Sequence, residues 1–517
     1  MIYDKISSLL QDSAKTTVQG LRGSSTAHLA ATIDTSIACC CIVPDEHLIQ
    51  GFENDLKLFT DREILVYPGQ EIPPYTPLSP DQHITAKRLS TLYRLREGKA
   101  PILITSIEAL LRRIMPSQLL ADVAEYVESG ESCDQDDLLE KLCYLGYENV
   151  SLVQSIGDFS LRGGIIDIYP PSFAMEDGSI HEGPLRLDFF GDTIDSLRSF
   201  DPFTQRSTGE IPLAVFLPVT DILLKDNKQQ QRKISRAFEE LGEAENWNSE
   251  ETARLMERAA NGMRFAGMEF FLPLYYQDQK SQSSAVLDFL PKNSVLLLLD
   301  PEGIRQSMQL TFERIETNYQ AAKGNGAPAL TPIEIFLDKD EIEQSLASFS
   351  QLSISDFPAA GDISTSVSTS NHQLLKQEIS LKRAKLGLLA PLTDQIHTWQ
   401  NQQDRVIICC RSERHTKNLA ELLSKHNHSI EITEAPLNLE AITASATPET
   451  LYLCDHPLSE GFSFPEAKIH LLSESELFGE MRVGGKSKKK SKGEPVRFTE
   501  LHEGDVIVHR DHGLGIY

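Results

Sequence analysis

Two runs of alternating apolar and polar residues flank the dipeptide Gly191-Asp192, and they constrain the fold more than any other feature. Successive side chains of a strand point to opposite faces of a sheet. In the first run, one face consists of Leu185, Leu187 and Phe189. The other face consists of Arg186, Asp188 and Phe190. A Gly-Asp pair between two such runs predicts a tight antiparallel β-hairpin with one face in a core.

Phe190 is unusual because it belongs to the face that should be polar. Arg186 lies on the same predicted face, and an aromatic residue beside an arginine is typical of protein-protein hot spots. We therefore expect Phe190 to be an exposed binding residue. The alternative is that Phe190 packs beneath a neighbouring loop.

The same region resembles a known family. The two stretches that carry the resemblance are GDFSLRGGIIDIYP at 157–170 and LRLDFFGDTIDSLR at 185–198. They are similar to the UvrA-binding domain that UvrB shares with the bacterial transcription-repair coupling factors. In that family, two arginines and the second aromatic of the second stretch grip UvrA. The resemblance implies that Arg162, Arg186 and Phe190 bind UvrA here.

Composition limits the function classes. The chain has 517 residues, enough for three or four domains, and a formal net charge of −26 that disfavours a broad DNA-binding surface. No apolar run approaches the roughly 20 residues of a membrane span, and no secretory signal opens the sequence, so we expect a cytoplasmic protein without a membrane partner. The eight cysteines form no C-x-x-C pair, and we expect no metal site.

Strand-like and helix-like patterns alternate along the first 120 residues or so, which predicts a parallel α/β sheet. The predicted organisation is an α/β domain at 1–122 and 216–317, an inserted domain at 123–215, a connector at 318–374, a second α/β domain at 375–470, a basic flexible linker at 480–494 and a final unit at 495–517. The basic linker could make a secondary contact with nucleic acid.

The segment Gly20–Ala27 invites comparison with a phosphate loop, whose final Gly-Lys-Ser/Thr neutralises phosphate and holds magnesium. The positions that form this degenerate loop are Gly20, Gly23, Ser24, Ser25, Thr26 and Ala27. Thr26 takes the place of the lysine. A charge contact at ~4 Å is worth about 4 kcal/mol at an effective dielectric of ~20. Micromolar binding totals only about 8 kcal/mol, so the sequence predicts no useful ATP affinity.

The acidic half of a nucleotide site also looks degenerate. The buried-strand run Val295–Leu299 is followed by Asp300 and Glu302, which are not adjacent. An ATPase needs acids at such a position to hold magnesium and polarise water. We interpret both acids as turn or helix-start residues.

Further stretches at 67–75, 79–81, 88–92, 105–111, 473–479 and 504–517 resemble the coupling factor family in the same order. The resemblance implies an α/β fold: a UvrB-like, degenerate helicase-type parallel domain with an inserted β-hairpin-rich α+β domain, a second small α/β domain and the start of a Tudor-like β-barrel. The strand pattern at 504–517 looks cut short, so we expect the N-terminal half of such a protein.

The resemblance implies a function in transcription-coupled nucleotide excision repair. The chain would recruit UvrA to lesions marked by a stalled RNA polymerase, and the truncated barrel would bind the polymerase β subunit. Catalysis, ATP with magnesium, and most DNA contacts would belong to motor domains outside this sequence. A monomer is the simplest expectation.

Two alternatives remain. One is an active UvrB-like ATPase and excision-nuclease subunit, and the other is an α/β interaction protein unrelated to repair.

Overall fold

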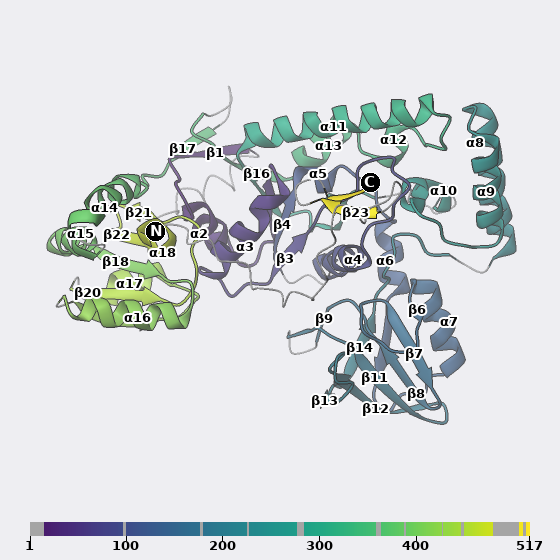
Figure 1. Cartoon of the computed structure of the whole chain (residues 1–517), viewed down its shortest axis with the longest axis horizontal. Coiled ribbons are helices and arrows are strands. Elements are labelled where there is room, and N and C mark those ends of the chain that lie inside the picture. Colours follow the sequence, from purple (N-terminus) through teal and green to yellow (C-terminus); the bar gives the residue numbers. More distant parts are fainter. Residues whose placement is uncertain are drawn as a thin grey trace, which may run out of the picture.

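The computed structural model describes residues 15–478, except 97–99, 176–178, 225–226, 277–283, 358–362, 387–388, 427 and 446–448, together with 506–509 and 513–516. Three larger β-sheets organise these residues, with seven, six and five strands. In Figure 1 the seven-stranded sheet is central, the five-stranded sheet lies at one end and the six-stranded sheet hangs below the other end.

The central sheet has the order β17-β1-β16-β15-β2-β4-β3, and its neighbouring strands are all parallel. Its strands are β1 (Lys15–Gln19), β2 (Cys39–Val43), β3 (Ile64–Tyr67), β4 (Ile102–Ser106), β15 (Val295–Leu299), β16 (Ser350–Ile354) and β17 (Ile363–Ser366). The continuous apolar runs of β2, β4 and β15 are typical of parallel strands covered on both faces. The predicted parallel α/β sheet is therefore present.

Helices cover this sheet on both sides. They are α2 (Ser25–Thr32), α3 (Ile49–Lys57), α4 (Gln82–Arg96), α5 (Ile107–Leu110), α6 (Ser117–Val123), α11 (Pro301–Gly324), α12 (Pro332–Ile335) and α13 (Lys339–Ala347). The long helix α11 runs along one edge of the molecule in Figure 1. Helices α8 (Lys228–Ala244) and α9 (Ser249–Ala260) pack together beyond its end, and the short α10 (Leu272–Tyr275) lies next to them.

The prediction of a connector at 318–374 was wrong. This stretch contains the end of α11, helices α12 and α13, and strands β16 and β17. Strand β16 lies between β1 and β15 in the middle of the central sheet. Its sequence SQLSI is polar at three of five positions, so it lacks the apolar run by which a buried strand is recognised.

The six-stranded sheet is inserted between β4 and β15 and has the order β13-β12-β11-β8-β7-β6. Its strands are β6 (Glu148–Asn149), β7 (Asp158–Arg162), β8 (Ile165–Ile168), β11 (Leu185–Phe190), β12 (Thr193–Phe200) and β13 (Ser207–Glu210). Two small two-stranded sheets accompany it, β5 (Glu125–Glu128) with β14 (Leu213–Phe216) and β9 (Phe173–Ala174) with β10 (Ile180–His181). Helix α7 (Gln135–Leu145) begins at an Asp134 cap and ends at Gly146, whose φ is 95°.

The second α/β unit has a five-stranded sheet of order β19-β20-β18-β22-β21. Its elements are α14 (Gln373–Leu386), α15 (Leu389–Asn401), β18 (Arg405–Cys409), α16 (Glu413–Ser424), β19 (Ser429–Thr433), α17 (Leu439–Ser445), β20 (Thr450–Cys454), β21 (Phe462–Phe464), β22 (Ile469–Ser473) and α18 (Glu474–Phe478). Only β21 pairs antiparallel within this sheet.

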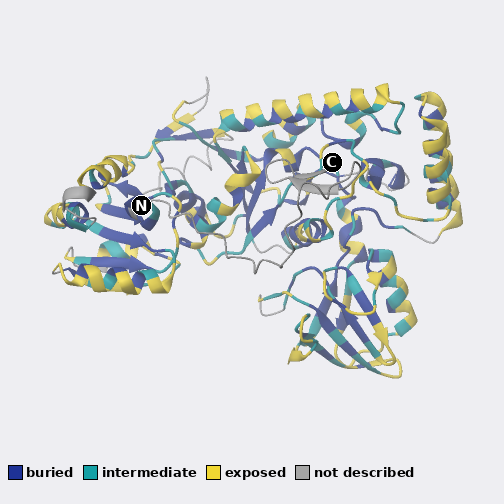
Figure 2. Ribbon diagram, viewed as in Figure 1, coloured by how far each residue is buried: buried dark blue, intermediate teal, exposed yellow. Residues whose placement is uncertain are grey.

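The central sheet and the second α/β unit share one apolar core. A single cluster of buried side chains includes Val18, Leu56 and Phe59 from the first unit and Phe462 and Leu471 from the second. Figure 2 shows the strands of both sheets buried and the outer sides of α11, α9 and α16 exposed. The two units therefore pack as one body rather than as separate domains on a tether.

Near the C-terminus, β23 (Val506–His509) and β24 (Gly513–Ile516) form an antiparallel pair. The predicted basic linker at 480–494 lies outside the described residues. Within the part of the chain that is described, no helix is long and apolar enough to cross a membrane.

Candidate protein-binding face and degenerate nucleotide site

The predicted hairpin is formed by β11 and β12. Phe190 pairs with Thr193, which leaves Gly191 and Asp192 as the two turn residues. Gly191 has a φ of 63°, a backbone conformation that glycine adopts without strain. A β-bulge interrupts the pairing between Asp188 and Phe189, but the alternation along β11 itself continues to Phe190.

Strand register brings the three predicted binding residues onto one face of the sheet. One cross-strand row consists of Ser160, Asp167, Arg186 and Arg198. The next row on the same face consists of Arg162, Ile165, Asp188 and Ser196. Phe190 follows on β11, so Arg162, Arg186 and Phe190 share what we call the arginine face. Their binding roles stay predictions.

The side chain of Phe190 is 84% exposed, whereas Leu185 and Leu187 on the opposite face are fully buried. Phe190 does not pack beneath a loop, which decides between the two expectations from the sequence. A large aromatic side chain left in water on a mostly polar face is typical of an interface anchor.

The side chain of Arg186 is mostly buried and is hydrogen-bonded within its own domain. Its Nε donates to Oδ1 of Asp167 at 2.7 Å, and its Nη2 donates to Oδ2 at 2.9 Å. The guanidinium also lies over the Phe200 ring at 4.8 Å from the centroid. The hydrogen bond with Asp167 raises the pKa of Arg186 despite partial burial. With only 18% of its side chain exposed, Arg186 is mainly a structural cation.

Arg162 and Arg198 are the more accessible cations of this face. Arg162 is exposed and donates to the Ser151 carbonyl at 2.9 Å. Arg198 forms an ion pair with Asp188, and 38% of its side chain is exposed. Both guanidinium groups can offer charge-assisted hydrogen bonds to carboxylates of a partner.

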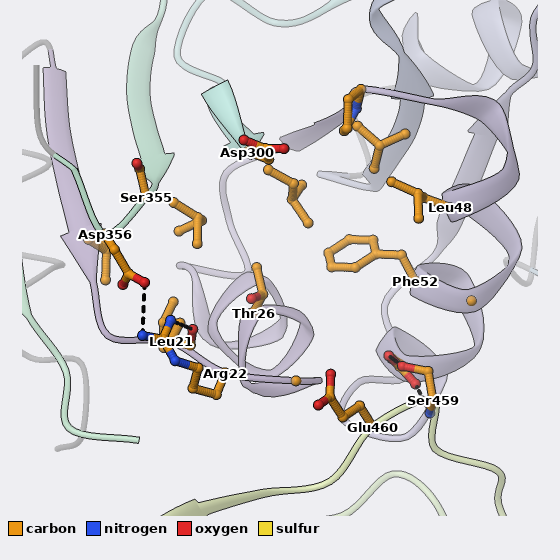
Figure 3. A pocket seen from close by; sticks show the side chains of 18 of the residues that line it. Leu21, Arg22, Thr26, Leu48, Phe52, Asp300, Ser355, Asp356, Ser459 and Glu460 are labelled. Carbon is orange, nitrogen blue, oxygen red and sulfur yellow. Dashed lines mark hydrogen bonds and ion pairs between the residues drawn. The ribbon is translucent and has the colours of Figure 1, made fainter. Parts of the chain in front are cut away.

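The degenerate phosphate loop lies between a strand and a helix, as a functional phosphate loop does. It connects β1 to α2, at the edge of the central sheet where parallel strands end. A cavity of about 650 Å³ lies there, and Thr26, Arg22 and Asp300 are among the residues that line it (Figure 3). The sheet therefore retains the cleft in which α/β folds bind ligands.

The groups that would hold phosphate are engaged elsewhere. The amide of Ser24 donates to the Glu460 carbonyl at 3.1 Å. Arg22 forms an ion pair with Asp356 at 2.8 Å, and the Gly20 amide donates to the same carboxylate at 3.1 Å. The hydrogen bond from Arg22 lowers the pKa of Asp356. These contacts compete with a bound anion.

The loop 455–461 of the second α/β unit, which joins β20 to β21 and which we call the serine loop, packs against the phosphate loop. The buried Asp55 of α3 accepts from the Ser24 hydroxyl at 2.7 Å and from the Ser459 amide at 2.8 Å. Burial raises the pKa of Asp55, although the Ser459 and Ser24 hydrogen bonds oppose the shift. At Gly23, with a φ of 53°, an added Cβ would lie 2.6 Å from the Gly461 carbonyl oxygen.

The two acids after β15 serve the following helix. Asp300 caps α11, because its carboxylate accepts from the Gly303 amide at 3.1 Å. Glu302 forms an ion pair with Arg305 one turn later. Both are helix-start acids, as expected. Across the described ranges, no group of three or more His, Cys, Asp or Glu could hold a metal ion.

Sequence reasoning missed Asp356, Ser459 and Glu460, which lie more than 300 residues from the loop that they contact. No local pattern marks them, because each is polar and placed in a turn. The most exposed large apolar side chain among the described residues, Phe203, was also missed for lack of periodicity.

Two family models match the chain. The UvrB interaction domain matches residues 126–221, and the MFD, D3 domain matches residues 399–477. The first contains the arginine face and the second contains the serine loop. The matches lie in the inserted sheet and in the second α/β unit, which have unrelated folds.

Curated relatives match almost the whole chain. The transcription-repair-coupling factor of Myxococcus xanthus is 28% identical over 516 residues, which are 96% of this chain and 42% of the relative. Those of Escherichia coli and Bacillus subtilis are 26% and 23% identical, again over 96% of this chain. The chain thus spans about two fifths of the length of these relatives. The chain is therefore similar, over nearly all of its length, to part of the transcription-repair-coupling factors, and two of its regions match domain models named for UvrB interaction and for MFD.

Proposed function

We propose that this chain recruits UvrA in transcription-coupled nucleotide excision repair, at lesions marked by a stalled RNA polymerase. The observation that carries the proposal is the exposed Phe190 on the same sheet face as the exposed Arg162, in a domain that matches the UvrB interaction domain. The names of the relatives support the role in coupling transcription to repair.

The binding chemistry combines one apolar anchor with accessible cations. Burying a phenylalanine side chain against a partner is worth about 2 kcal/mol. Arg162 and Arg198 would donate charge-assisted hydrogen bonds to acidic side chains of UvrA. Arg186 would shape the face between them, because its Nε and Nη2 donate to Asp167 within the domain.

We also propose that this part of the protein binds no ATP and catalyses no reaction. Thr26 supplies no charge to a phosphate, and the Ser24 amide already donates to the Glu460 carbonyl. ATP and magnesium, DNA translocation and most DNA contacts would reside in motor domains beyond these residues. Contact with the polymerase β subunit would be made by a Tudor-like barrel to which β23 and β24 belong.

Competition with UvrB tests recruitment. UvrA is titrated against this chain by isothermal calorimetry, first alone and then in the presence of excess UvrB. Because UvrB carries a matching domain, we expect saturable binding that UvrB abolishes. Binding that UvrB leaves unchanged, or no binding, would overturn the proposed site.

A further inference from the structure

Phe203 is exposed more than any other large apolar side chain in the described parts of the chain, at 88%. It lies in the loop 201–206, which joins β12 to β13 in the inserted domain. An exposed phenylalanine stabilises nothing in the isolated domain. A single exposed apolar side chain is common on protein surfaces, so a partner is inferred here from the loop and the neighbours of Phe203.

Several internal hydrogen bonds hold the loop that carries Phe203. The Asp201 carboxylate accepts from the amides of Phe203 at 3.0 Å and Thr204 at 2.6 Å. The Gln205 amide donates to the Asp201 carbonyl at 2.7 Å, and the Gln205 side chain donates to the Val153 carbonyl at 3.2 Å. A side chain on such a loop is already positioned, so little conformational entropy is lost when it binds.

Arg186 connects this loop to the arginine face. Its Nη1 donates to the Gln205 carbonyl at 3.4 Å, while its guanidinium stacks on Phe200 and pairs with Asp167. One arginine therefore fastens the loop to the face that bears Phe190. This contact places the loop 201–206 next to the strand that bears Phe190.

We propose that Phe203 is a second aromatic anchor for UvrA and that Arg186 is the positioning residue that holds its loop in place. The inference rests on the proposed function. Arg186 and Phe190 are four residues apart on one strand, a distance of about 13 Å. A standard interface covers roughly 800 Å² of each partner, a patch about 30 Å across. Phe190 lies within such a patch centred on Arg186, and Phe203 lies two residues from Gln205, whose carbonyl Arg186 contacts.

Charge supports the same partner. The matched domain at 126–221 contains five basic residues, Lys141, Arg162, Arg186, Arg198 and Arg206. The last four lie on the arginine face or on the loop beside it, in a chain whose net charge is −26. Arg186 and Arg198 are paired with Asp167 and Asp188, so Arg162, which donates to a backbone carbonyl, is the cation of this face that best suits a carboxylate of the partner.

The test compares dissociation constants for UvrA. We expect Phe203→Ala to weaken binding about tenfold or more and Phe203→Leu to restore most of it. Phe357→Ala is the matched control, because Phe357 is 87% exposed but lies beside the nucleotide-site cavity. If Phe190→Ala weakens binding and Phe203→Ala does not, the inference is overturned while recruitment stands. If the unaltered chain does not bind, both are overturned.

A double-mutant cycle tests the positioning role. The substitution Arg186→Lys keeps a positive charge beside Asp167. Lysine lacks the planar guanidinium group that donates to Asp167 and to the Gln205 carbonyl at the same time. We expect this change to weaken UvrA binding in the unaltered chain and to have a smaller effect in the Phe203→Ala background. Equal effects in the two backgrounds would show that Arg186 does not act through Phe203.

Discussion

Arg186 and Asp167 form a two-pronged ion pair across strands β11 and β8, with both contacts at 2.9 Å or less. Asp167 is only 1% exposed, so its charge depends on this single arginine for compensation. A buried carboxylate that loses its cation is strongly destabilising. The residue that resemblance marks as a binding arginine therefore also stabilises the fold by neutralising a buried carboxylate.

Replacement of Arg186 by alanine should lower the free energy of unfolding by about 3 kcal/mol, because Asp167 would be left buried and unpaired. Urea denaturation followed by circular dichroism measures the change. Arg162→Ala is the matched control and should stay within about 0.5 kcal/mol of the unaltered chain, since Arg162 is exposed. Equal stability of the Arg186 and control variants would show that the ion pair contributes little.

His28 should make the junction of the two α/β units sensitive to acid. Its ring lies 5.0 Å from Phe59 and 5.8 Å from Phe464, and burial lowers its pKa to about 4. The unfolded chain takes up the proton at a pKa of about 6.5, so stability is lost as the pH falls from there towards 4. The loss between pH 7.5 and pH 5 should be about 2 kcal/mol.

Denaturation at both pH values, for the unaltered chain and for His28→Gln, isolates this effect because the other titrating groups cancel. Glutamine stays neutral, so the variant should lose less stability on acidification. Parallel pH dependence of the two proteins would rule out His28 as the cause.

ATP with magnesium should leave the melting temperature of this chain unchanged. Thr26→Lys should not restore binding either, because the Ser24 amide donates to the Glu460 carbonyl and Arg22 is paired with Asp356. Differential scanning fluorimetry at millimolar ATP tests both proteins. A nucleotide-dependent rise in melting temperature of the unaltered chain would favour the rival UvrB-like ATPase.

Gly23→Ala should loosen the contact between the phosphate loop and the serine loop. The added Cβ would meet two backbone carbonyl oxygens, at 2.6 Å on Gly461 and 3.0 Å on Glu460. Backbone atoms cannot move aside as a flexible side chain would, so we expect a loss of more than about 2 kcal/mol. Gly130→Ala is the control, since it has a comparable positive φ but no atom within 4 Å. Equal denaturation midpoints would contradict the clash.

The elements that could be predicted from the sequence are those whose own residues show a clear hydrophobic pattern. Strand β15 is the unbroken apolar run at 295–299, and β2 and β4 are buried strands of the same kind within the first 120 residues. Strands β16 and β17 were missed because their sequences, SQLSI and ISTS, are mostly polar. Their place in the sheet comes from parallel pairing with β1, which no nearby residue encodes.

The candidate site also has features that the local sequence predicts and features that it does not. Alternation along β11 placed Phe190 on the outer face of the sheet but left open whether a loop covers it, and the structure shows the side chain exposed. Alternation could not reveal that Arg186 is paired with Asp167, since this depends on the register between strands 19 residues apart. The closure of Ser459 and Glu460 over the phosphate loop depends on packing between units more than 400 residues apart in the chain.

The most direct test of UvrA recruitment is the dissociation constant for purified UvrA with the unaltered chain, Phe190→Ala and Phe357→Ala. Both phenylalanines are more than 80% exposed, so neither substitution should affect folding. The account predicts that Phe190→Ala weakens binding at least tenfold, about 1.4 kcal/mol, while Phe357→Ala binds like the unaltered chain. Equal affinity of all three proteins would contradict it.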